Sequence, residues 1–347
     1  MRGTITLGET YAQSLEQTAA RIVWAIVAIL NMIAIGADAS NAFAEAPPPV
    51  APLFVRVDNQ YREWWTKCKK RPPIPFGYGL RVKRALQGHP ESPRLWASLI
   101  HSIIQKLGLH PCVHEPCLYY AEKIDGKDMR VLFFRQVDDF AVACMNKAGA
   151  ETIISKINES MSIQIKVLGV IDRFNGMDVS QTKWYVELHN NTYIRKILEN
   201  KQHLLDGKVH TFPIPMHSGS EYTKQLETAA SLSEQDLKNV EKEYGFSYRQ
   251  AIGEILYALV TCRMGISFAL TKLSQYSTKP TKVHFEAVAT LYRYLHATEN
   301  DGIYYWRTQP RQDLPDGHHL CLGSFYVQQD ISFEYIHMHR LSRLKDG

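Results

Sequence analysis

The chain has 347 residues, of which 45% are hydrophobic and 22% charged, a composition typical of globular proteins rather than of disordered or fibrous ones. Lys and Arg exceed Asp and Glu by only 40 to 35, so the net charge permits a nucleic-acid partner without establishing one. Six cysteines that lie far apart in a long chain indicate reduced thiols rather than a disulfide framework, and we expect an intracellular, non-secreted protein.

The first predicted element is a helix from Glu9 to Ile35, where apolar residues recur at helical spacing before a stop at Gly36. Its most apolar part, residues 22–35, is shorter than the roughly 20 apolar residues that span a bilayer. We therefore expect a buried helix and no membrane partner. A Pro-rich loop follows, then a strand near residues 53–57 and an aromatic and basic stretch at 61–71.

The middle of the chain alternates between helical and extended patterns. Predicted helices cover residues 90–109, 148–161 and 191–200, and predicted strands cover 117–122, 131–145, 172–180 and 184–188. We expect a linker at 206–235, followed by helices at 248–264 and 280–297. This order predicts an α+β fold with helices on one face of a sheet.

Two adjacent carboxylates, Asp138 and Asp139, interrupt an apolar and β-prone run from Val131 to Cys144. Charges beside buried strands are unfavourable unless they are exposed at a turn or neutralised by partners or cations. A surface hairpin with a polar tip is one reading. The other requires a third carboxylate, and Asp38 supplies one at the end of another apolar segment. Carboxylates on neighbouring strand ends could hold two divalent cations about 4 Å apart, as in enzymes that transfer nucleotides.

Two other groups of residues permit different interpretations. The Cys and His residues between His110 and Cys117 could bind zinc, but their spacing fits no common structural zinc pattern. The basic run Lys67 to Arg71 follows Trp64 and Trp65. It could combine phosphate contacts with base stacking, or it could be a solvated basic loop.

Six motifs occur in a specific order along the chain, and together they resemble the reverse transcriptase domain of copia-type LTR retrotransposons. They lie at residues 38–43, 80–88, 92–96, 115–119, 137–140 and 174–177. Later segments at 248–253, 267–275 and 284–295 are similar to the region between polymerase and RNase H in the same family. The resemblance covers roughly residues 9–306.

This resemblance implies a right-hand polymerase fold, with a palm made of an antiparallel sheet and helices, reduced fingers, and a helical thumb or connection. It assigns residues 1–36 to residual fingers and a leading helix, 37–205 to the palm with the remaining fingers, and 206–306 to the linker and thumb or connection helices. Residues 307–347 receive no assignment. The implied activity is RNA-directed DNA polymerisation, a two-metal nucleotidyl transfer to a primer 3′-end.

The implied partners are an RNA or DNA template with its primer, deoxynucleoside triphosphates, and other Pol polyprotein segments. Two Mg²⁺ ions, or Mn²⁺ in their place, are the implied cofactors. The implied location is the cytoplasm, within a virus-like particle, or the nucleus.

The resemblance also gives roles to single residues. The catalytic metal ligands would be Asp38, Asp138 and Asp139. The nucleotide-binding residues would be Phe43, Lys83, Arg84, Gln87, Gly88 and Gln136, and the primer grip would contain Phe174, Gly176 and Met177. These roles have structural alternatives. Phe43 could be a core residue, Lys83 and Arg84 could be solvated side chains, and the strand at 174–179 could be an ordinary strand.

The sequence departs from the family pattern at three places. Gln136 stands where the family usually has an aromatic residue, and no acidic motif of the kind that opens the family's RNase H domain follows Trp306. By the same resemblance, we expect most of the fingers to be missing. These departures favour an alternative function, a truncated and catalytically inactive retroelement remnant that at most binds nucleic acid. Whether the chain is an enzyme therefore stays open at this point.

Overall fold

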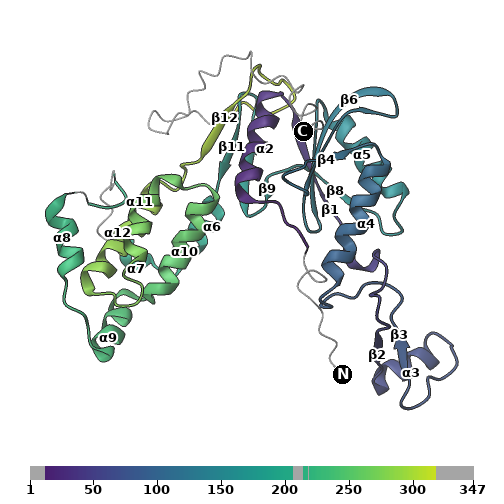
Figure 1. Ribbon diagram of the computed structural model, residues 1–347, viewed down its shortest axis with the longest axis horizontal. Coiled ribbons are helices and arrows are strands. Elements are labelled where there is room, and N and C mark those ends of the chain that lie inside the picture. Colours follow the sequence, from purple (N-terminus) through teal and green to yellow (C-terminus); the bar gives the residue numbers. More distant parts are fainter. Residues whose placement is uncertain (1–11, 206–213, 218, 318–347) are drawn as a thin grey trace.

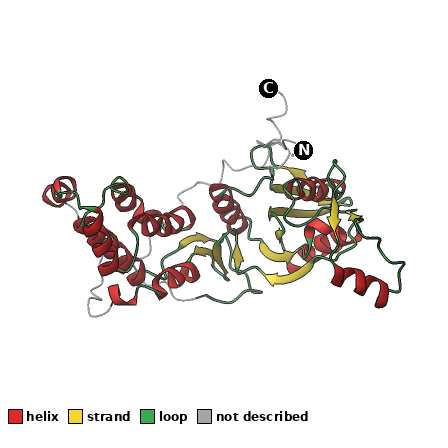
Figure 2. Cartoon of the chain, turned by 90° about the horizontal axis from the view of Figure 1, so that it is seen from below, coloured by secondary structure: helices red, strands yellow, loops and turns green. Residues whose placement is uncertain are grey.

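The computed structural model describes residues 12–205, 214–217 and 219–317. A central unit of two antiparallel sheets is flanked by a helical unit (residues 191–297) on one side and a small lobe (residues 54–81) on the other (Figure 1). Figure 2, a view from below, shows the strands gathered in the middle and helices at both ends. The predicted α+β class with antiparallel strands is confirmed.

The larger sheet has the strand order β4-β5-β6-β7-β1-β8. Its strands are β1 (Ile33–Asp38), β4 (His110–Pro111), β5 (Leu118–Ile124), β6 (Lys127–Gln136), β7 (Asp139–Cys144) and β8 (Lys166–Val170). Strands β6 and β7 form a hairpin, and β1 pairs antiparallel with both β7 and β8. A strand from the start of the chain thus lies in the middle of the sheet, beside the hairpin.

Both faces of this sheet are covered. Helices α4 (Ser92–Lys106) and α5 (Lys147–Glu159) pack on one face, where the rings of Trp96 and Phe140 stack with centroids 6.2 Å apart. On the other face, α2 (Gln17–Ile29) and a second sheet form a separate core. The expectation that helices would cover only one face was therefore wrong.

The predicted helix at residues 9–35 was also wrong in its extent. Helix α2 ends at Ile29, Asn31 adopts a left-handed φ of 54°, and β1 begins at Ile33. A short apolar run does not distinguish a buried strand from a helix, and here pairing with two neighbouring strands decides for the strand. Gly36 lies inside β1 rather than ending a helix. The domain boundary placed after residue 36 falls within this strand.

The second sheet has the order β12-β11-β10-β9. Its strands are β9 (Arg173–Phe174), β10 (Met177–Gln181), β11 (Tyr185–His189) and β12 (Ile303–Trp306). Strands β11 and β12 are paired neighbours, yet the whole helical unit lies between them in sequence. The helical unit is therefore an insertion whose two ends are attached to adjacent strands.

The helical unit packs around α12 (Lys282–Ala297), in which most residues are buried. Its other elements are α6 (Asn191–Glu199), α7 (Gln202–Leu205), α8 (Ser220–Thr228), α9 (Glu234–Tyr244), α10 (Tyr248–Thr261), η2 (Met264–Ile266) and α11 (Ser267–Ser274). The linker expected at 206–235 is wrong for residues 220–228, which form α8. Residues 206–213 and 218 lie outside the described residues. The other predicted helices are confirmed to within a few residues.

The residues that follow β12 pack against the central unit. Arg307 is buried and donates hydrogen bonds to the carbonyls of Thr182 and Met32, and Arg311 donates to those of Asn31 and Met145. Two of these carbonyls, those of Asn31 and Met32, lie in the turn between α2 and β1, and the bonds satisfy them. Residues 307–347 received no assignment from the resemblance, and the described start of this segment is thus part of the fold.

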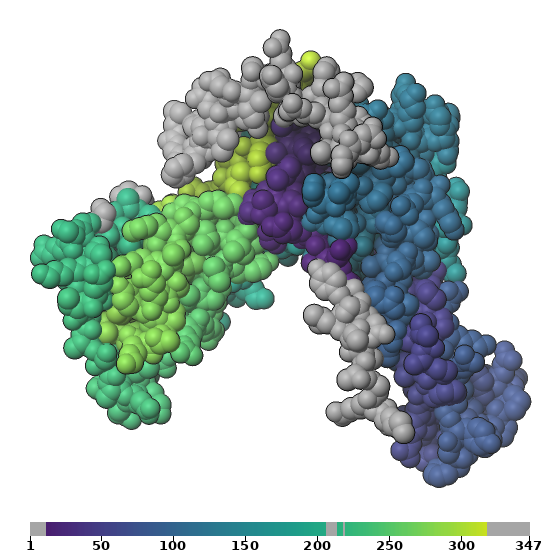
Figure 3. All heavy atoms as spheres, in the orientation of Figure 1, coloured from purple at the N-terminus to yellow at the C-terminus, as the bar shows by residue number. Residues whose placement is uncertain are grey.

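The small lobe consists of β2 (Phe54–Arg56), α3 (Asn59–Lys67) and β3 (Gly79–Arg81), and β2 pairs with β3. Asp58 caps α3 by accepting a hydrogen bond from the Tyr61 amide. Helix α3 contains no buried residue. The lobe projects from the central unit, as Figures 1 and 3 show.

Two expectations from composition can be compared with the described residues. None of their helices is long and apolar enough to cross a membrane. The five cysteines among them are free thiols, as predicted, and the sixth, Cys321, lies outside the described residues.

Candidate active site

The three aspartates meet at one end of the central sheet. Asp38 is the last residue of β1 and Asp139 is the first residue of β7, and the two are direct partners in the antiparallel register. Asp138 lies in the tight turn that joins β6 to β7. Sheet pairing therefore brings together carboxylates that are about a hundred residues apart in the sequence.

Residues paired across a sheet direct their side chains to the same face. The row across four strands reads Gln136, Asp139, Asp38 and Lys166. This row lies on the sheet face that α2 and the second sheet cover nearer the middle of the strands. Phe134, which lies two residues before Gln136 and so points to the same face, is part of the core between them. At the end of the strands the cover stops and Asp139 is exposed.

The turn that carries Asp138 is held from two sides. The Trp96 indole donates a hydrogen bond of 2.9 Å to the Val137 carbonyl, and the Ala39 amide donates one of 3.1 Å to the Asp138 carbonyl. Val137 itself has a φ of 57°, which is unfavourable for a β-branched residue. Strained positions of this kind persist where the surrounding structure holds them, often at functional sites.

The carboxylates influence one another. The pKa of Asp139 is raised above its ordinary value, first by partial desolvation and then by the negative charges of Asp138 and Asp38. Asp38 accepts a hydrogen bond of 2.7 Å from the Ser40 hydroxyl. Within residues 12–205, 214–217 and 219–317, no three His, Cys, Asp or Glu side chains are arranged so that they could hold one metal ion together. The side chains of the three aspartates would have to turn toward one another to do so.

Apart from Gln136, which ends β6, the predicted nucleotide-binding residues occupy two adjoining segments. Phe43 lies in the short helix η1 (Ala42–Ala44) directly after β1, where it is half-buried against the core on the α4 side. Arg84 donates a hydrogen bond of 2.9 Å to the Glu45 carbonyl, which joins the loop at residues 82–91 to the segment after η1.

The other predicted residues of the loop at 82–91 are solvent-exposed. Lys83, Gln87 and Gly88 all lie on the surface of that loop. Among the described residues, no hydrogen bond or ion pair links their side chains to the aspartates. Of the whole predicted group, Gln136 lies nearest to the aspartates, since it pairs directly with Asp139, and the loop residues are exposed to solvent.

The predicted primer-grip residues form a tight hairpin of β9 and β10. Phe174 and Met177 are buried in the core beneath it, and the Phe174 ring packs edge-on against Phe134 at 5.0 Å. Gly176 lies in the exposed turn with a φ of 76°. The turn of this hairpin is accessible to another molecule, whereas the two apolar side chains are not.

A connection between the two hairpins through Leu15 was not expected from the residue pattern. The Leu15 amide donates a hydrogen bond of 3.0 Å to the Gln136 side chain, and the Leu15 carbonyl accepts one of 3.0 Å from the Asn175 side chain. The segment before α2 therefore bridges the aspartate-bearing hairpin and the β9–β10 hairpin. Because the bridge uses the backbone of Leu15, no sequence motif could have revealed it.

Lys166 was also missed. It lies beside Asp38 in the register on the exposed edge strand β8. The only sequence signal was the short β-prone run from Val167 to Val170. That run was too short and too close to a helix to be recognised as a strand.

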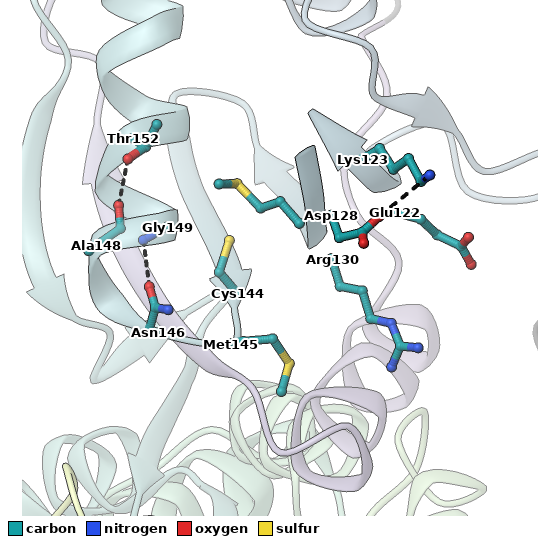
Figure 4. Close-up of a pocket in the computed structure, with 11 residues that line it drawn as sticks. Glu122, Lys123, Asp128, Arg130, Cys144, Met145, Asn146, Ala148, Gly149 and Thr152 are labelled. Carbon is teal, nitrogen blue, oxygen red and sulfur yellow. Dashed lines mark hydrogen bonds and ion pairs between the residues drawn. The ribbon is translucent and has the colours of Figure 1, made fainter. Parts of the chain in front are cut away.

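A separate hollow of about 700 Å³ lies at the opposite end of β7 from Asp139 (Figure 4). Lys123 and Asp128 form an ion pair of 3.5 Å at its rim, and Asn146 caps α5 by accepting a hydrogen bond from the Gly149 amide. Burial raises the pKa of the Cys144 thiol to about 12, so this sulfur stays protonated and weakly reactive. The thiol that lines the hollow is therefore not a reactive nucleophile.

Comparison with known proteins shows similarity to the products of mobile elements. The chain is 22% identical over 310 residues to a retrovirus-related Pol polyprotein from transposon TNT 1-94 of Nicotiana tabacum, which covers 88% of this chain and 22% of that protein. It is 22% identical over 311 residues to the corresponding polyprotein from transposon RE1 of Arabidopsis thaliana, covering 87% of this chain and 19% of the relative.

A third relative is the putative transposon Ty5-1 protein of Saccharomyces cerevisiae, with 24% identity over 220 residues, 62% of this chain and 64% of the yeast protein. The chain thus spans about a fifth of the length of the two plant relatives. No family model matches the chain, and no solved structure matches it.

Proposed function

We propose, from the relationship of this chain to the Pol polyproteins of copia-type retrotransposons, that it is the polymerase segment of such a polyprotein, an RNA-directed DNA polymerase. The central unit would be the palm and the helical unit the thumb or connection. The small lobe and the segment before α2 would be reduced fingers. The reaction would add deoxynucleotides to a primer 3′-end opposite an RNA or DNA template.

One observation carries this proposal. Asp38 and Asp139 are direct partners on adjacent strands, and Asp138 lies at the neighbouring turn. Carboxylates gathered at one strand end are costly because they are partly desolvated and their charges repel, and the pKa of Asp139 is raised by desolvation first and by this repulsion second. Such crowding is typical of sites where a cation or a reaction makes use of the charges.

The donor set fits Mg²⁺ or Mn²⁺, since both prefer hard carboxylate oxygens. Asp38, Asp138 and Asp139 would hold the ions, with a rotation of side chains from the arrangement described above. Bound there, divalent ions would activate the primer hydroxyl and offset the charge on the departing pyrophosphate.

The chain's own residues would supply positioning. Half-buried Phe43, in the turn after Asp38, would lie under the incoming sugar and leave no room for a 2′-hydroxyl. Exposed Lys83 and Gln87 would contact the triphosphate from the loop that Arg84 ties to the segment after Phe43. The exposed turn at Gly176 would meet the primer end.

The test is primer extension on poly(rA) with an oligo(dT) primer. We expect the wild type to extend the primer in the presence of Mg²⁺ or Mn²⁺. A variant with Asp138→Asn and Asp139→Asn should lose at least about a hundredfold in rate, because charge stabilisation in the transition state is lost. The matched control is Asp128→Asn, an exposed aspartate at the other end of the sheet, which should retain full activity.

Equal extension by the wild type and the double variant would remove the polymerase claim. The alternative, an inactive remnant that binds nucleic acid, has one observation in its favour, namely Gln136 bound to Leu15 at the position of the family's aromatic residue. It predicts no extension but salt-sensitive binding of a primer-template.

A further inference from the structure

The small lobe concentrates the positive charge of the whole molecule. Residues 54–81 contain seven Lys or Arg and two Asp or Glu, a net charge of +5. The complete chain also carries +5, so the remaining residues sum to zero. A basic excess confined to one projecting lobe makes a local positive field that attracts polyanions.

The same lobe exposes aromatic rings to an extent that is unusual for a folded surface. Phe76 is 88% exposed, Tyr78 is 66% exposed and Trp64 is 40% exposed. Monomeric proteins rarely leave large apolar groups together at the surface unless another molecule binds there. In Figure 3 the lobe stands away from the body of the protein, and its visible face is open to solvent.

These rings are held in place rather than loosely attached. Arg62 on α3 donates hydrogen bonds to the carbonyls of Ile74, Pro75 and Tyr78, and its guanidinium lies 5.8 Å from the centre of the Phe76 ring. The loop that carries Phe76 and Tyr78 is therefore braced from the helix. Little conformational entropy would be lost when a ligand stacks on these rings.

The second aromatic group lies on α3 itself. Tyr61 packs against Trp64 with ring centroids 5.3 Å apart, and the Lys69 ammonium lies 5.1 Å from the centre of the Trp64 ring. A hollow of about 330 Å³ opens beside α3, with Arg56, Phe76 and Tyr78 among its lining residues. Cations and ring faces thus alternate over the surface of the lobe.

Alternating cations and ring faces match one kind of partner. Basic side chains contact phosphates, and exposed rings stack on bases that are not paired with another strand. A double helix hides its base faces, so it would use the charges but not the rings. An acidic protein segment would likewise leave the rings without a partner of matching shape.

We propose that the small lobe is a binding site for single-stranded nucleic acid, with Phe76, Tyr78 and Trp64 stacking on bases and Lys69, Lys70 and their basic neighbours contacting phosphates. The site goes beyond the proposed polymerase activity because binding needs none of the aspartates. In a polymerase it would hold the unpaired strand. Stacking on bases and contacts with phosphates do not distinguish deoxyribose from ribose, so DNA and RNA single strands could both bind in this way.

The test is fluorescence anisotropy with the full chain and three labelled probes: oligo(dT), oligo(rU) and a duplex of mixed sequence. We expect both single strands to bind more tightly than the duplex. The variant with Phe76→Ala and Tyr78→Ala should weaken single-strand binding at least about tenfold and leave duplex binding nearly unchanged, because stacking on each ring contributes a factor of this order. Circular dichroism would verify that the variant is folded.

The matched control for the rings is Phe268→Ala, which removes a 74% exposed aromatic ring from α11 of the helical unit and should not change the affinity. For the charges, the variant with Lys69→Gln and Lys70→Gln should reduce the slope of log affinity against log salt by roughly 0.7 for each phosphate that these lysines no longer neutralise. Lys238→Gln, on the exposed surface of α9, should leave that slope unchanged.

Three results would overturn the proposal: unchanged single-strand affinity in the aromatic variant, an equal loss for the duplex, or equally strong competition by poly-glutamate. Preference for oligo(dT) over oligo(rU), or the reverse, would identify the strand type. The Asp138→Asn and Asp139→Asn variant should bind single strands like the wild type. Failure of primer extension would therefore not contradict the binding site on the small lobe. Failure of single-strand binding would not contradict the polymerase proposal, which primer extension tests separately.

Discussion

At the scale of single residues, Asp139 is the carboxylate most affected by its surroundings. Its pKa is raised by desolvation, and further by Asp138 and Asp38. The folded chain therefore holds a proton on this carboxyl more tightly than the unfolded chain does. Stability falls as pH rises from the ordinary Asp pKa, about 3.9, through the raised value, and the penalty is fully present above it.

Asp139→Asn should remove this penalty. At about pH 7 we expect the variant to be more stable than the wild type by less than about 1 kcal/mol, because interactions between exposed charges are screened. At about pH 3, below the ordinary Asp pKa, the difference should vanish. Urea unfolding at both pH values measures it, and a variant that is less stable than the wild type at neutral pH would contradict the argument.

Asp128→Asn is the control for this measurement. It removes an exposed carboxylate that forms an ion pair with Lys123, so no gain is expected at neutral pH. Adding Mg²⁺ gives a further readout, since an ion that binds only the folded state raises its stability. If the aspartates hold Mg²⁺, the ion should stabilise the wild type more than Asp139→Asn.

At the scale of elements, two hairpins are joined through a backbone segment. Gln136 belongs to the β6–β7 hairpin and Asn175 to the β9–β10 hairpin, and both bond to Leu15. The Gln136 side chain therefore has a defined structural role, since it accepts a hydrogen bond from the Leu15 amide. This explains how a Gln is accommodated beside the aspartates.

Gln136→Met keeps the length of the side chain but removes the acceptor for the Leu15 amide. We expect the free energy of unfolding to fall by about 1 kcal/mol and hydrogen exchange at the Leu15 amide to accelerate. Gln164→Met, on an exposed residue whose only described bond is a long one of 3.4 Å, is the matched control and should change little.

A double-mutant cycle with Asn175→Gly would show whether the two bonds act together. Glycine retains the left-handed backbone at this position, where φ is 50°, while removing the side-chain donor. Since both bonds hold the same residue, we expect a coupling of at least about 0.5 kcal/mol. Strictly additive effects would mean that Leu15 does not connect the hairpins.

At the scale of the whole molecule, the helical unit touches the central unit at the turn of the β9–β10 hairpin. The Tyr257 hydroxyl of α10 lies 3.5 Å from the Gly176 carbonyl. A Cβ atom on Gly176 would come within 2.0 Å of that hydroxyl. Arg21 of α2 adds a second connection by donating to the carbonyls of Val260 and Thr261 at the end of α10.

Gly176→Ala should therefore strain the backbone and also push the tip of the Tyr257 ring away from the hairpin, so that the contact with the Gly176 carbonyl is lost. Gly126→Ala is a close match, because Gly126 has the same φ of 76° but nothing within 4 Å of its added Cβ. We expect Gly126→Ala to cost about 1 kcal/mol and Gly176→Ala to cost clearly more. Equal losses in thermal unfolding would show that the Tyr257 contact is not tight.

The order of motifs along the chain was sufficient to identify Asp38, Asp138 and Asp139 as candidate site residues, and helical periodicity was sufficient for most helices. These signals are local, since each depends on neighbouring residues in the sequence. Periodicity failed at residues 30–36, where an apolar run is compatible with either helix or strand. There the pairing partners β7 and β8 decided the outcome.

Only the tertiary structure decided which distant residues became neighbours. Sheet register placed Asp38 beside Asp139 and Lys166, and hydrogen bonds from the Gln136 and Asn175 side chains to the backbone of Leu15 placed that residue between the two hairpins. The insertion of the helical unit between β11 and β12 set the contact between Gly176 and Tyr257. The alternation of apolar residues limits which register a strand can adopt, but the choice of partner strand and the hydrogen bonds to the Leu15 backbone involve main-chain atoms that every residue shares, so no local pattern in the sequence identifies them.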